Sequence, residues 1–460
     1  MRLPTRPPLQ PGQALDCYLE HLAEANHLEP FDLLNVLQST LSREELRYLT
    51  LAPSPTALRA ISDLSGQDVG ALHAATQAGY GPLAPADFSR LEPARPAASY
   101  RAIAATGWVM GHGTQACPDC LAAHGTWQTS WMLYASIGCT RHHRTLTATC
   151  PRCQRPLRDS RHSPLRPHGA STACQNPQDV RGQHCLHNLA TITTPAMTTE
   201  TSAYQHALDH VLAGHRPRLL GQPAQGATWL SEHRALASLI CHITTHNPDR
   251  TQPWQTALLD EATRRTDVRG PRWGITPPAS PWIRGHALAE AHSILTRPDP
   301  DSAAHALQAW ILRIPSSTEA LTTWTRDRLP TNHHVTALVN AAALVRRRPG
   351  RRITALALPE LSAEQIPWII PETLAARHLP ALPGVTNRTR NAYAALCLAR
   401  HLPDVTTWAQ AAEALGLPGD SGIRTARLCS AAMRTHHDTF THGLATLARQ
   451  LANTSPGSRP

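Results

Sequence analysis

Apolar residues recur at helical spacing along most of the 460-residue chain. Leu15, Leu19 and Leu22 follow one another at i, i+4 and i+7, which places them on one face of an amphipathic helix. Similar stripes predict further helices over 56–65, 68–78, 203–213, 228–246, 254–266, 284–296, 302–313, 318–327, 334–347, 388–401, 406–415, 421–436 and 439–451. Strand signals are weak, so the pattern predicts a mainly α, multi-domain helical protein whose short β pieces are confined to one small module in the N-terminal half.

Changes in composition divide this helical pattern into parts. A segment rich in proline and alanine at 81–98 and a polar, weakly charged segment at 191–202 are predicted to be loops or linkers. Between them the helical periodicity fades, and cysteine and histidine become dense. We therefore expect an N-terminal helical domain at 1–105, a Cys-rich module at 106–190, a helical domain at 203–330 and a C-terminal helical domain at 331–453.

Seven of the 11 cysteines lie in the Cys-rich module, and most of them are paired. A CxxC turn directs two thiolates at one point, and two such pairs complete the tetrahedron that zinc prefers. Pairing neighbours gives a first site of Cys117, Cys120, Cys139 and His142 and a second site of Cys150, Cys153, Cys174 and Cys185. The spacing thus predicts a tandem zinc-finger module with two zinc ions.

Other ligand sets remain open at this stage. The first and third pairs could share a metal, His143 could replace His142, and His184 or His187 could replace Cys185. In every set, protein ligands fill all four positions, which favours structural over catalytic zinc.

Composition narrows the function further. The net charge is +10, and all 43 basic residues are arginine. The absence of lysine excludes a P-loop NTPase, a protein kinase and a pyridoxal-phosphate enzyme, since each needs a lysine in its own chain. No long apolar window predicts a membrane span, and the N-terminus lacks the apolar core of a signal peptide. We therefore expect a cytoplasmic protein whose cysteines are reduced.

Two segments suggest contact with DNA. Residues 406–434 are predicted to form a helix-turn-helix, because Ala412 is small and lies four residues before the turn glycine Gly416, which lets two helices cross closely. In its second helix Ile423, Ala426 and Leu428 are expected to face inward. The run 346–352 is the most basic patch of the chain. The candidate phosphate-contacting residues are Arg346, Arg347, Arg348, Arg351, Arg352, Arg424, Arg427 and Arg434.

The Cys-rich module also carries tryptophans and arginines that could either contact nucleic acid or have a purely structural or solvent-facing role. Trp127 and Trp131 are expected to pack the core of this small module rather than to stack on bases. Its arginines either meet phosphates or face solvent, and the sequence favours neither interpretation; they are Arg141, Arg144, Arg152, Arg155, Arg158, Arg161, Arg166 and Arg181. The turn from Ala23 to Leu28 is a further, weaker helix-turn-helix candidate.

These motifs resemble a known family. The resemblance rests on the run Cys117-Pro118-x-Cys120-Leu121, Trp127, Trp131-x-Leu133, Cys139-x-x-His142, Leu146, Cys150-Pro151-x-Cys153 and Pro156-Leu157. This run is similar to the TniQ family of transposition target-selection proteins, which includes the TnsD-like proteins. The sequence departs from the family pattern at 13–18, where Glu-Ser-Leu-Ser and an aromatic residue are expected, and after Cys185, where glycine is usual.

The resemblance implies a non-enzymatic adaptor. Such a protein would link DNA, or a nucleic-acid-guided targeting complex, to an AAA+ ATPase that regulates the transposase. The resemblance is also compatible with a homodimer. An alternative is a helix-turn-helix transcription regulator with structural zinc. A nuclease or transposase with an acidic metal site is a third interpretation, but no spacing of acidic residues recommends it.

Overall fold

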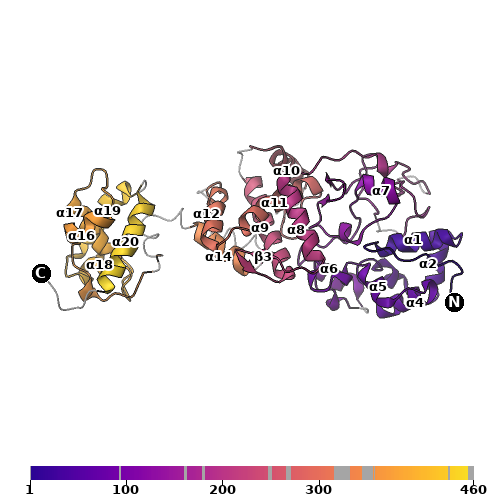
Figure 1. Cartoon of the computed structure of the whole chain (residues 1–460), viewed down its shortest axis with the longest axis horizontal. Helices are drawn as coiled ribbons and strands as arrows, with labels where there is room; N and C mark the ends of the chain where they lie inside the picture. Colours follow the sequence, from indigo (N-terminus) through magenta and orange to yellow (C-terminus); the bar gives the residue numbers. More distant parts are fainter. Residues whose placement is uncertain are drawn as a thin grey trace. The chain divides into compact units, whose positions relative to one another are not determined.

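The protein divides into two units that are mainly helical, as predicted (Figure 1). The computed structural model describes residues 2–92, 95–159, 163–178, 182–246, 251–265, 271–314, 332–343, 356, 358–433 and 436–453. The first unit spans Met1–Ala341 and the second Ala342–Pro460. The three parts predicted between residues 1 and 330 lie in one unit, so that finer division stays a prediction. Among the described helices, none has the length and apolar character needed to cross a membrane.

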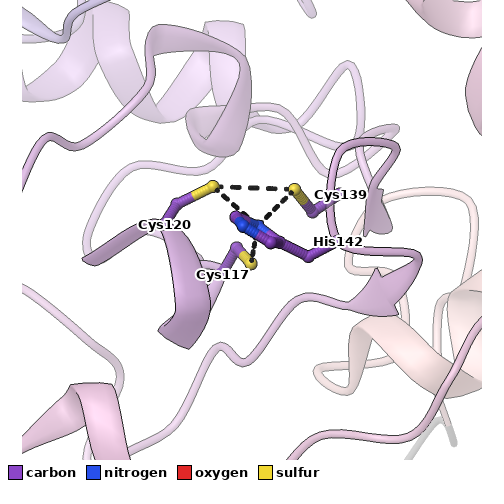
Figure 2. A group of neighbouring side chains, drawn as sticks. All are labelled: Cys117, Cys120, Cys139 and His142. Atoms are coloured by element: carbon purple, nitrogen blue, oxygen red, sulfur yellow. Dashed lines mark hydrogen bonds between the residues drawn. The ribbon is translucent and has the colours of Figure 1, made fainter. Parts of the chain in front are cut away.

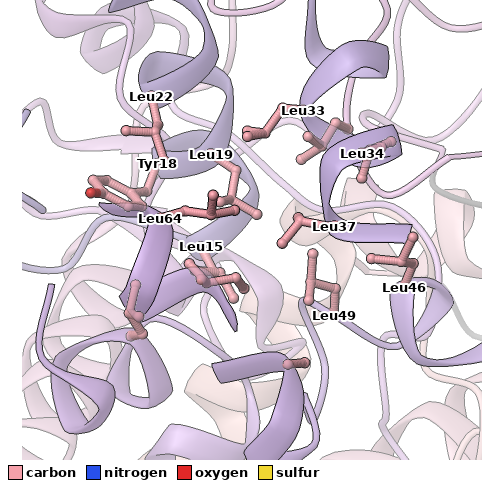
Figure 3. Close-up of a cluster of buried hydrophobic side chains, with 14 of the residues drawn as sticks. Leu15, Tyr18, Leu19, Leu22, Leu33, Leu34, Leu37, Leu46, Leu49 and Leu64 are labelled. Atoms are coloured by element: carbon pink, nitrogen blue, oxygen red, sulfur yellow. The ribbon is translucent and has the colours of Figure 1, made fainter. Parts of the chain in front are cut away.

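The N-terminal helices of the first unit surround a leucine-rich core (Figure 3). The helices that contribute to it are α1 (Leu15–Ala25), α2 (Pro30–Gln38), α3 (Arg43–Arg47), α4 (Pro55–Ser65) and α5 (Val69–Ala74), whereas α6 (Pro96–Ala104), later in the chain, adds no residue to it. The predicted stripe Leu15, Leu19 and Leu22 is fully buried. Local signals set the helix ends: the Ser54 hydroxyl accepts a hydrogen bond from the Ala57 amide at the start of α4, and Gly66 ends that helix with φ +72°.

The segment predicted as a loop at 81–98 contains short helices. The 3-10 helices η1 (Ala78–Leu83) and η2 (Phe88–Arg90) come first, and α6 starts at Pro96. The prediction was wrong for α6 because proline is tolerated in the first turn of a helix, where its missing N–H costs nothing.

The Cys-rich module has little regular structure, as its lost periodicity predicted. It contains α7 (Pro118–His124), η3 (Thr129–Met132), β1 (Gly138–Cys139), β2 (Arg144–Thr145) and η4 (Leu189–Thr191). Strands β1 and β2 pair antiparallel, with Gly138 opposite Thr145 and Cys139 opposite Arg144.

The predicted linker at 191–202 is in fact tied to this module. The amide of Thr145 donates to the carbonyl of Pro195 at 2.9 Å, and the amide of Met197 donates to the carbonyl of His143 at 2.9 Å. Residues 195–197 therefore extend the β2 hairpin, a pairing between distant segments that the sequence did not reveal.

The rest of the first unit is helical apart from one short two-stranded hairpin, so the prediction that strands are confined to the Cys-rich module was wrong for that hairpin. This part comprises α8 (Thr199–Leu212), β3 (Arg218–Leu219), β4 (Gln222–Pro223), α9 (Gly226–His246), α10 (Pro253–Arg264), α11 (Pro281–Leu295), α12 (Pro300–Ile311) and α14 (His333–Ala342). Helix α11 is central, since it packs on α8, α9, α10 and α12. The helix predicted at 318–327 lies outside the described residues.

The second unit is a helical bundle with an apolar core. It comprises η6 (Ala363–Gln365), α16 (Glu372–His378), α17 (Asn387–Ala399), α18 (Trp408–Ala414), α19 (Gly419–Ala432) and α20 (His437–Ala452). Tyr393, Phe440 and Leu444 lie fully buried in that core. Helix α16 was not predicted, because it is only seven residues long and buries just one side chain, Ala375.

Candidate metal centres in the Cys-rich module

The first cluster gathers three thiols and one imidazole (Figure 2). Nδ1 of His142 lies 3.5 Å from Sγ of Cys117, 3.3 Å from Sγ of Cys120 and 3.5 Å from Sγ of Cys139. The sulfurs of Cys120 and Cys139 are 3.6 Å apart. The four side chains thus converge on one point, and His142 rather than His143 supplies the imidazole.

Local structure explains this convergence. Cys117 precedes α7, Pro118 starts the helix, and Cys120 follows within the first turn, so both thiols project from one helix end. Cys139 belongs to β1, and His142 lies in the tight turn that joins β1 to β2.

The second cluster gathers four thiols. Sγ of Cys150 lies 3.8 Å from Sγ of Cys185, and Sγ of Cys153 lies 3.8 Å from Sγ of Cys174. Cys174 and Cys185 are distant in sequence but face each other across a hairpin, in which the Gln175 amide donates to the Cys185 carbonyl at 2.7 Å.

The two clusters follow the neighbour pairing rather than the crossed one. A tetrahedral ion with metal–sulfur bonds of about 2.3 Å and metal–nitrogen bonds of about 2.0 Å has S···S edges of about 3.8 Å and S···N edges of about 3.5 Å. The observed separations lie close to these values, so each cluster can hold one tetrahedral metal ion with protein atoms alone. Cys185 belongs to the second cluster, whereas His184 instead packs edge-on against His168.

Crowding of the thiols also favours a cation. The neighbouring sulfurs of Cys117 and Cys139, together with burial, raise the pKa of Cys120. Hydrogen bonds from Cys117 and Cys120 lower the pKa of Cys139. Burial and nearby thiolates raise the pKa of Cys174. Without a bound cation only some of these thiols can ionise, whereas a divalent ion stabilises all the thiolates together.

Side chains of helix α8 form hydrogen bonds to the residues on either side of Cys139 in the first cluster. The side-chain oxygen of Gln205 accepts hydrogen bonds from the amides of Ile137 and Gly138 at 2.8 and 3.0 Å, directly before Cys139. The hydroxyl of Thr140 donates to Asp209 at 3.0 Å, and the Gln205 amide donates to the same carboxylate. Such contacts orient the ligand loop.

The second cluster is supported by Asn176. Its amide nitrogen lies 3.7 Å from Sγ of Cys153 and donates to the carbonyl of Pro156 at 2.8 Å. One side chain therefore joins the Cys174–Cys185 hairpin to the Cys150–Cys153 turn.

An ion-pair network fastens α1 to the module around the second cluster. Glu20 of α1 is fully buried, and its carboxylate accepts two hydrogen bonds from the Arg158 guanidinium at 2.8 and 2.9 Å. It also accepts from the Arg166 guanidinium at 2.8 Å. Both guanidinium groups lie over the Trp127 ring, 4.7 and 5.4 Å from its centroid. Because the charges pair inside the protein, this network locks the N-terminal helices to the Cys-rich module.

This network answers two questions left open by the sequence. Trp127 and Trp131 are buried and meet edge to face, so they pack the module core as predicted. Arg158 and Arg166 are buried in ion pairs, so the phosphate-contact hypothesis is wrong for them. Arg144 pairs with Asp119 at 3.2 Å. Arg141 and Arg152 are exposed, and Arg161 and Arg181 lie outside the described residues.

The helix-turn-helix predicted at 406–434 corresponds to α18 and α19, two helices that cross closely. A Cβ on Gly422 would lie 2.2 Å from the Trp408 carbonyl oxygen and 2.8 Å from the Cβ of Ala412. The backbones therefore approach closely, and small Ala412 faces α19. The turn between the helices spans 415–418, with Gly416 at φ +75°.

The candidate DNA-contacting residues have different surroundings. Arg424 and Arg427 are exposed on α19. Leu428 is 59% exposed, so its predicted inward orientation was wrong: it lies beside Arg427 on the solvent face, while Ala426 and Cys429 are buried. The other predicted arginines, Arg346, Arg347, Arg348, Arg351, Arg352 and Arg434, lie outside the described residues. In the N-terminal helix-turn-helix candidate, α2 follows the turn from Ala23 to Leu28. This helix carries no arginine, and its Asp32 is exposed.

Sequence reasoning missed Glu20, Asn176 and Gln205. Each supports the clusters from a distant segment, and a lone polar residue at such a position carries no local signal. The hint that the sequence offered was that Asp16 and Glu20, four residues apart, place two acidic side chains on the largely apolar face of α1.

Comparison with known proteins supports the resemblance. The TniQ family model matches residues 4–146, which cover the N-terminal helices and the whole first cluster. No curated protein matches the chain. The predicted TniQ domain is therefore confirmed over residues 4–146.

Proposed function

We propose that the chain is a transposition target-selection adaptor without catalytic chemistry of its own. The match of residues 4–146 to the TniQ family carries this proposal. In this role the protein links DNA, or a nucleic-acid-guided targeting complex, to an AAA+ ATPase that regulates the transposase. The lysine-free sequence fits that division of labour, because P-loop chemistry requires a lysine and must then reside in the partner.

We assign the ions of both clusters as zinc with a structural role. Three cysteines with one histidine, and four cysteines together, are typical ligand sets of structural zinc, and four protein ligands leave no open position for a substrate. When bound, zinc supplies fixed tetrahedral cross-links between segments of the module. Elemental analysis of the purified protein should find about two zinc ions per chain, and less than one per chain would contradict this assignment.

The contact with the ATPase is tested by co-purification. The gene neighbourhood supplies the partner to test: an adjacent transposase and AAA+ ATPase are expected. The ATPase should retain this protein on DNA in the presence of a non-hydrolysable ATP analogue and release it in ADP. Absence of retention under DNA-loaded, ATP-bound conditions would contradict the adaptor role.

Helix α19 is the proposed DNA-contacting element among the described residues. Arg424 and Arg427 are exposed on it, and an adjacent crossed helix fixes its orientation. Replacing both with glutamine should weaken DNA binding at least about tenfold and reduce its salt dependence. The matched control replaces Arg377 and Arg449 with glutamine, because both are exposed, on α16 and α20, and their loss removes the same two charges elsewhere in the second unit. Equal losses in the two proteins would point to net charge alone.

The arginine run from 346 to 352 and Arg434 remain proposed phosphate contacts on sequence grounds. Neutralising the five arginines of the run should lower affinity for all DNA sequences alike, because backbone contacts carry no sequence information. A change in sequence preference would indicate base contact instead.

A helix-turn-helix transcription regulator is the second candidate. The crossing of α18 and α19 favours it, and the two zinc clusters would serve it equally well. Light scattering tests the homodimer that such regulators commonly form. Specific binding next to a promoter, with no response to any AAA+ partner, would favour the regulator.

A further inference from the structure

The first unit contains a cavity, partly open to solvent, that neither metal cluster uses. It lies where η1, residues 133–135 of the Cys-rich module and helices α8, α9 and α11 meet, and its volume is about 210 Å³. Apolar side chains form most of its wall, among them Trp108, Leu133, Leu230 and Leu288.

One charged group faces this apolar space. Arg234 of α9 lines the cavity, and its Nη1 donates to the carbonyl of Gly107 at 3.2 Å. Its Nε is buried and has no hydrogen-bond partner among the described residues. The other side-chain hydrogen-bonding groups of the lining are few, so a single guanidinium dominates the polarity of the cavity.

Two fully buried arginines differ from the partly buried Arg234 in their hydrogen-bond partners. Arg158 is matched by the carboxylate of Glu20. Arg284 is satisfied by three carbonyl groups and the side-chain oxygen of Gln115. Within the described part of the chain no carboxylate pairs with Arg234, and burial is the sole cause that lowers its pKa. Arg234 is partly buried, and the carbonyl of Gly107 is its one acceptor among the described residues, so an anion in the cavity would lower the free-energy cost of burying this charge.

We propose that this cavity binds a small organic carboxylate with an apolar body. A carboxylate carries one charge, which matches one guanidinium, and an apolar body matches the aromatic and aliphatic walls. Inorganic phosphate fits poorly, because its higher charge and hydration call for several donors. The volume equals that of roughly seven water molecules, which suits a compact ligand. This site is independent of the proposed adaptor function and can be tested without the transposition partners.

Calorimetric titration of the full-length, zinc-loaded protein with benzoate tests the proposal. Benzoate should bind at one saturable site, whereas benzamide, which has the same ring but no charge, should bind at least about tenfold more weakly. Inorganic phosphate should likewise bind weakly. Equal binding of benzoate and benzamide, or no saturable binding of benzoate, would overturn the proposal without the need for a variant.

Substitutions then locate the site. Arg234→Met should abolish benzoate binding, whereas Arg297→Met, which removes an exposed arginine after α11, should preserve it. Ala227→Leu, which fills part of the cavity and keeps the guanidinium, should also abolish binding if the cavity is the site. Zinc content and circular dichroism confirm that each variant is folded. Benzoate binding that survives both cavity substitutions, or Arg234-dependent binding of an acidic peptide without any binding of benzoate, would refute the small-ligand site.

Discussion

Cysteines have opposite surroundings in the Cys-rich module and in the C-terminal unit. In the module seven thiols and one imidazole form two clusters, and two tryptophans supply much of the remaining core. In the C-terminal unit Cys397 and Cys429 are buried among apolar side chains of a helical bundle. The difference teaches how each region is stabilised: the module gathers side chains that can bind metal ions, together with paired charges, whereas the bundle buries apolar side chains.

The same contrast extends to the charged groups. Glu20 is fully buried between two arginines, while the side chain of Glu372, which pairs with Arg390 in the C-terminal unit, is half exposed. The Glu20 ion pairs therefore lie in the interior of the first unit, whereas the Glu372–Arg390 ion pair lies nearer the surface of the second.

Loss of one cluster thiol should have the largest effect. Cys150→Ser removes a ligand, and because a structural zinc ion contributes on the order of 10 kcal/mol in small metal-binding domains, the second cluster should lose its metal and its hairpin should unfold. Zinc analysis should show one ion fewer, and hydrogen exchange should show lost protection around 150–189.

The matched control is Cys397→Ser in the C-terminal bundle. It should keep both ions and cost about 1–3 kcal/mol, because a hydroxyl is placed in an apolar core. A loss of zinc in this control, or none in Cys150→Ser, would break the contrast between the two regions.

Glu20→Gln should rank second. It leaves the buried Arg166 with a neutral partner and Arg158 with Asp16, at 3.4 Å, as its remaining carboxylate, so we expect a loss of about 3 kcal/mol in the free energy of unfolding of the first unit. Glu372→Gln should cost about 1 kcal/mol or less, since that carboxylate is half exposed. Urea denaturation of the two variants measures both values, and similar losses would show that burial does not distinguish the two ion pairs.

Mild acid should weaken the first unit through a histidine pair. Nε2 of His233 lies 3.1 Å from Nδ1 of His292, and burial lowers the pKa of His292 to about 4. The unfolded chain therefore binds more protons between about pH 6.5 and 4, and stability falls as the pH falls through that window, by up to about 3 kcal/mol.

Because acid also releases metal from thiolates, the informative quantity is the difference between proteins. His292→Asn should have a shallower dependence of unfolding free energy on pH than the unaltered protein between pH values of about 6.5 and 4. Identical slopes would show that this histidine pair does not contribute.

Gly422→Ala should cause the smallest loss of stability among these four substitutions, and the loss should be limited to the second unit. The added Cβ would meet the Trp408 carbonyl, which is backbone and can move only with its helix, so we expect a cost of about 1–3 kcal/mol. Gly419→Ala is a milder control, because its nearest contact is the flexible end of Glu413. Zinc content should be unchanged in both, and a thermal shift that is no larger for Gly422→Ala would contradict the tight crossing.

The fold was largely predictable wherever its signals are local. Helical stripes predicted α1, α9 and α17, and the paired spacing of cysteines predicted both clusters. The short helices α3 and α16 were missed because neither carries an apolar stripe: Leu46 is the one apolar residue of α3, and α16 buries only Ala375.

By itself, the sequence determined which residue types are present and how far apart they lie: the ligand pairs, the apolar stripes and the absence of lysine. The tertiary structure alone decided which distant segments meet. It paired residues 195–197 with the β1–β2 hairpin, and it placed Glu20 between Arg158 and Arg166 and Leu428 on the solvent face. The reason is physical: helix periodicity and ligand turns are set by neighbouring residues, whereas burial and ion pairing depend on contacts between segments far apart in the chain.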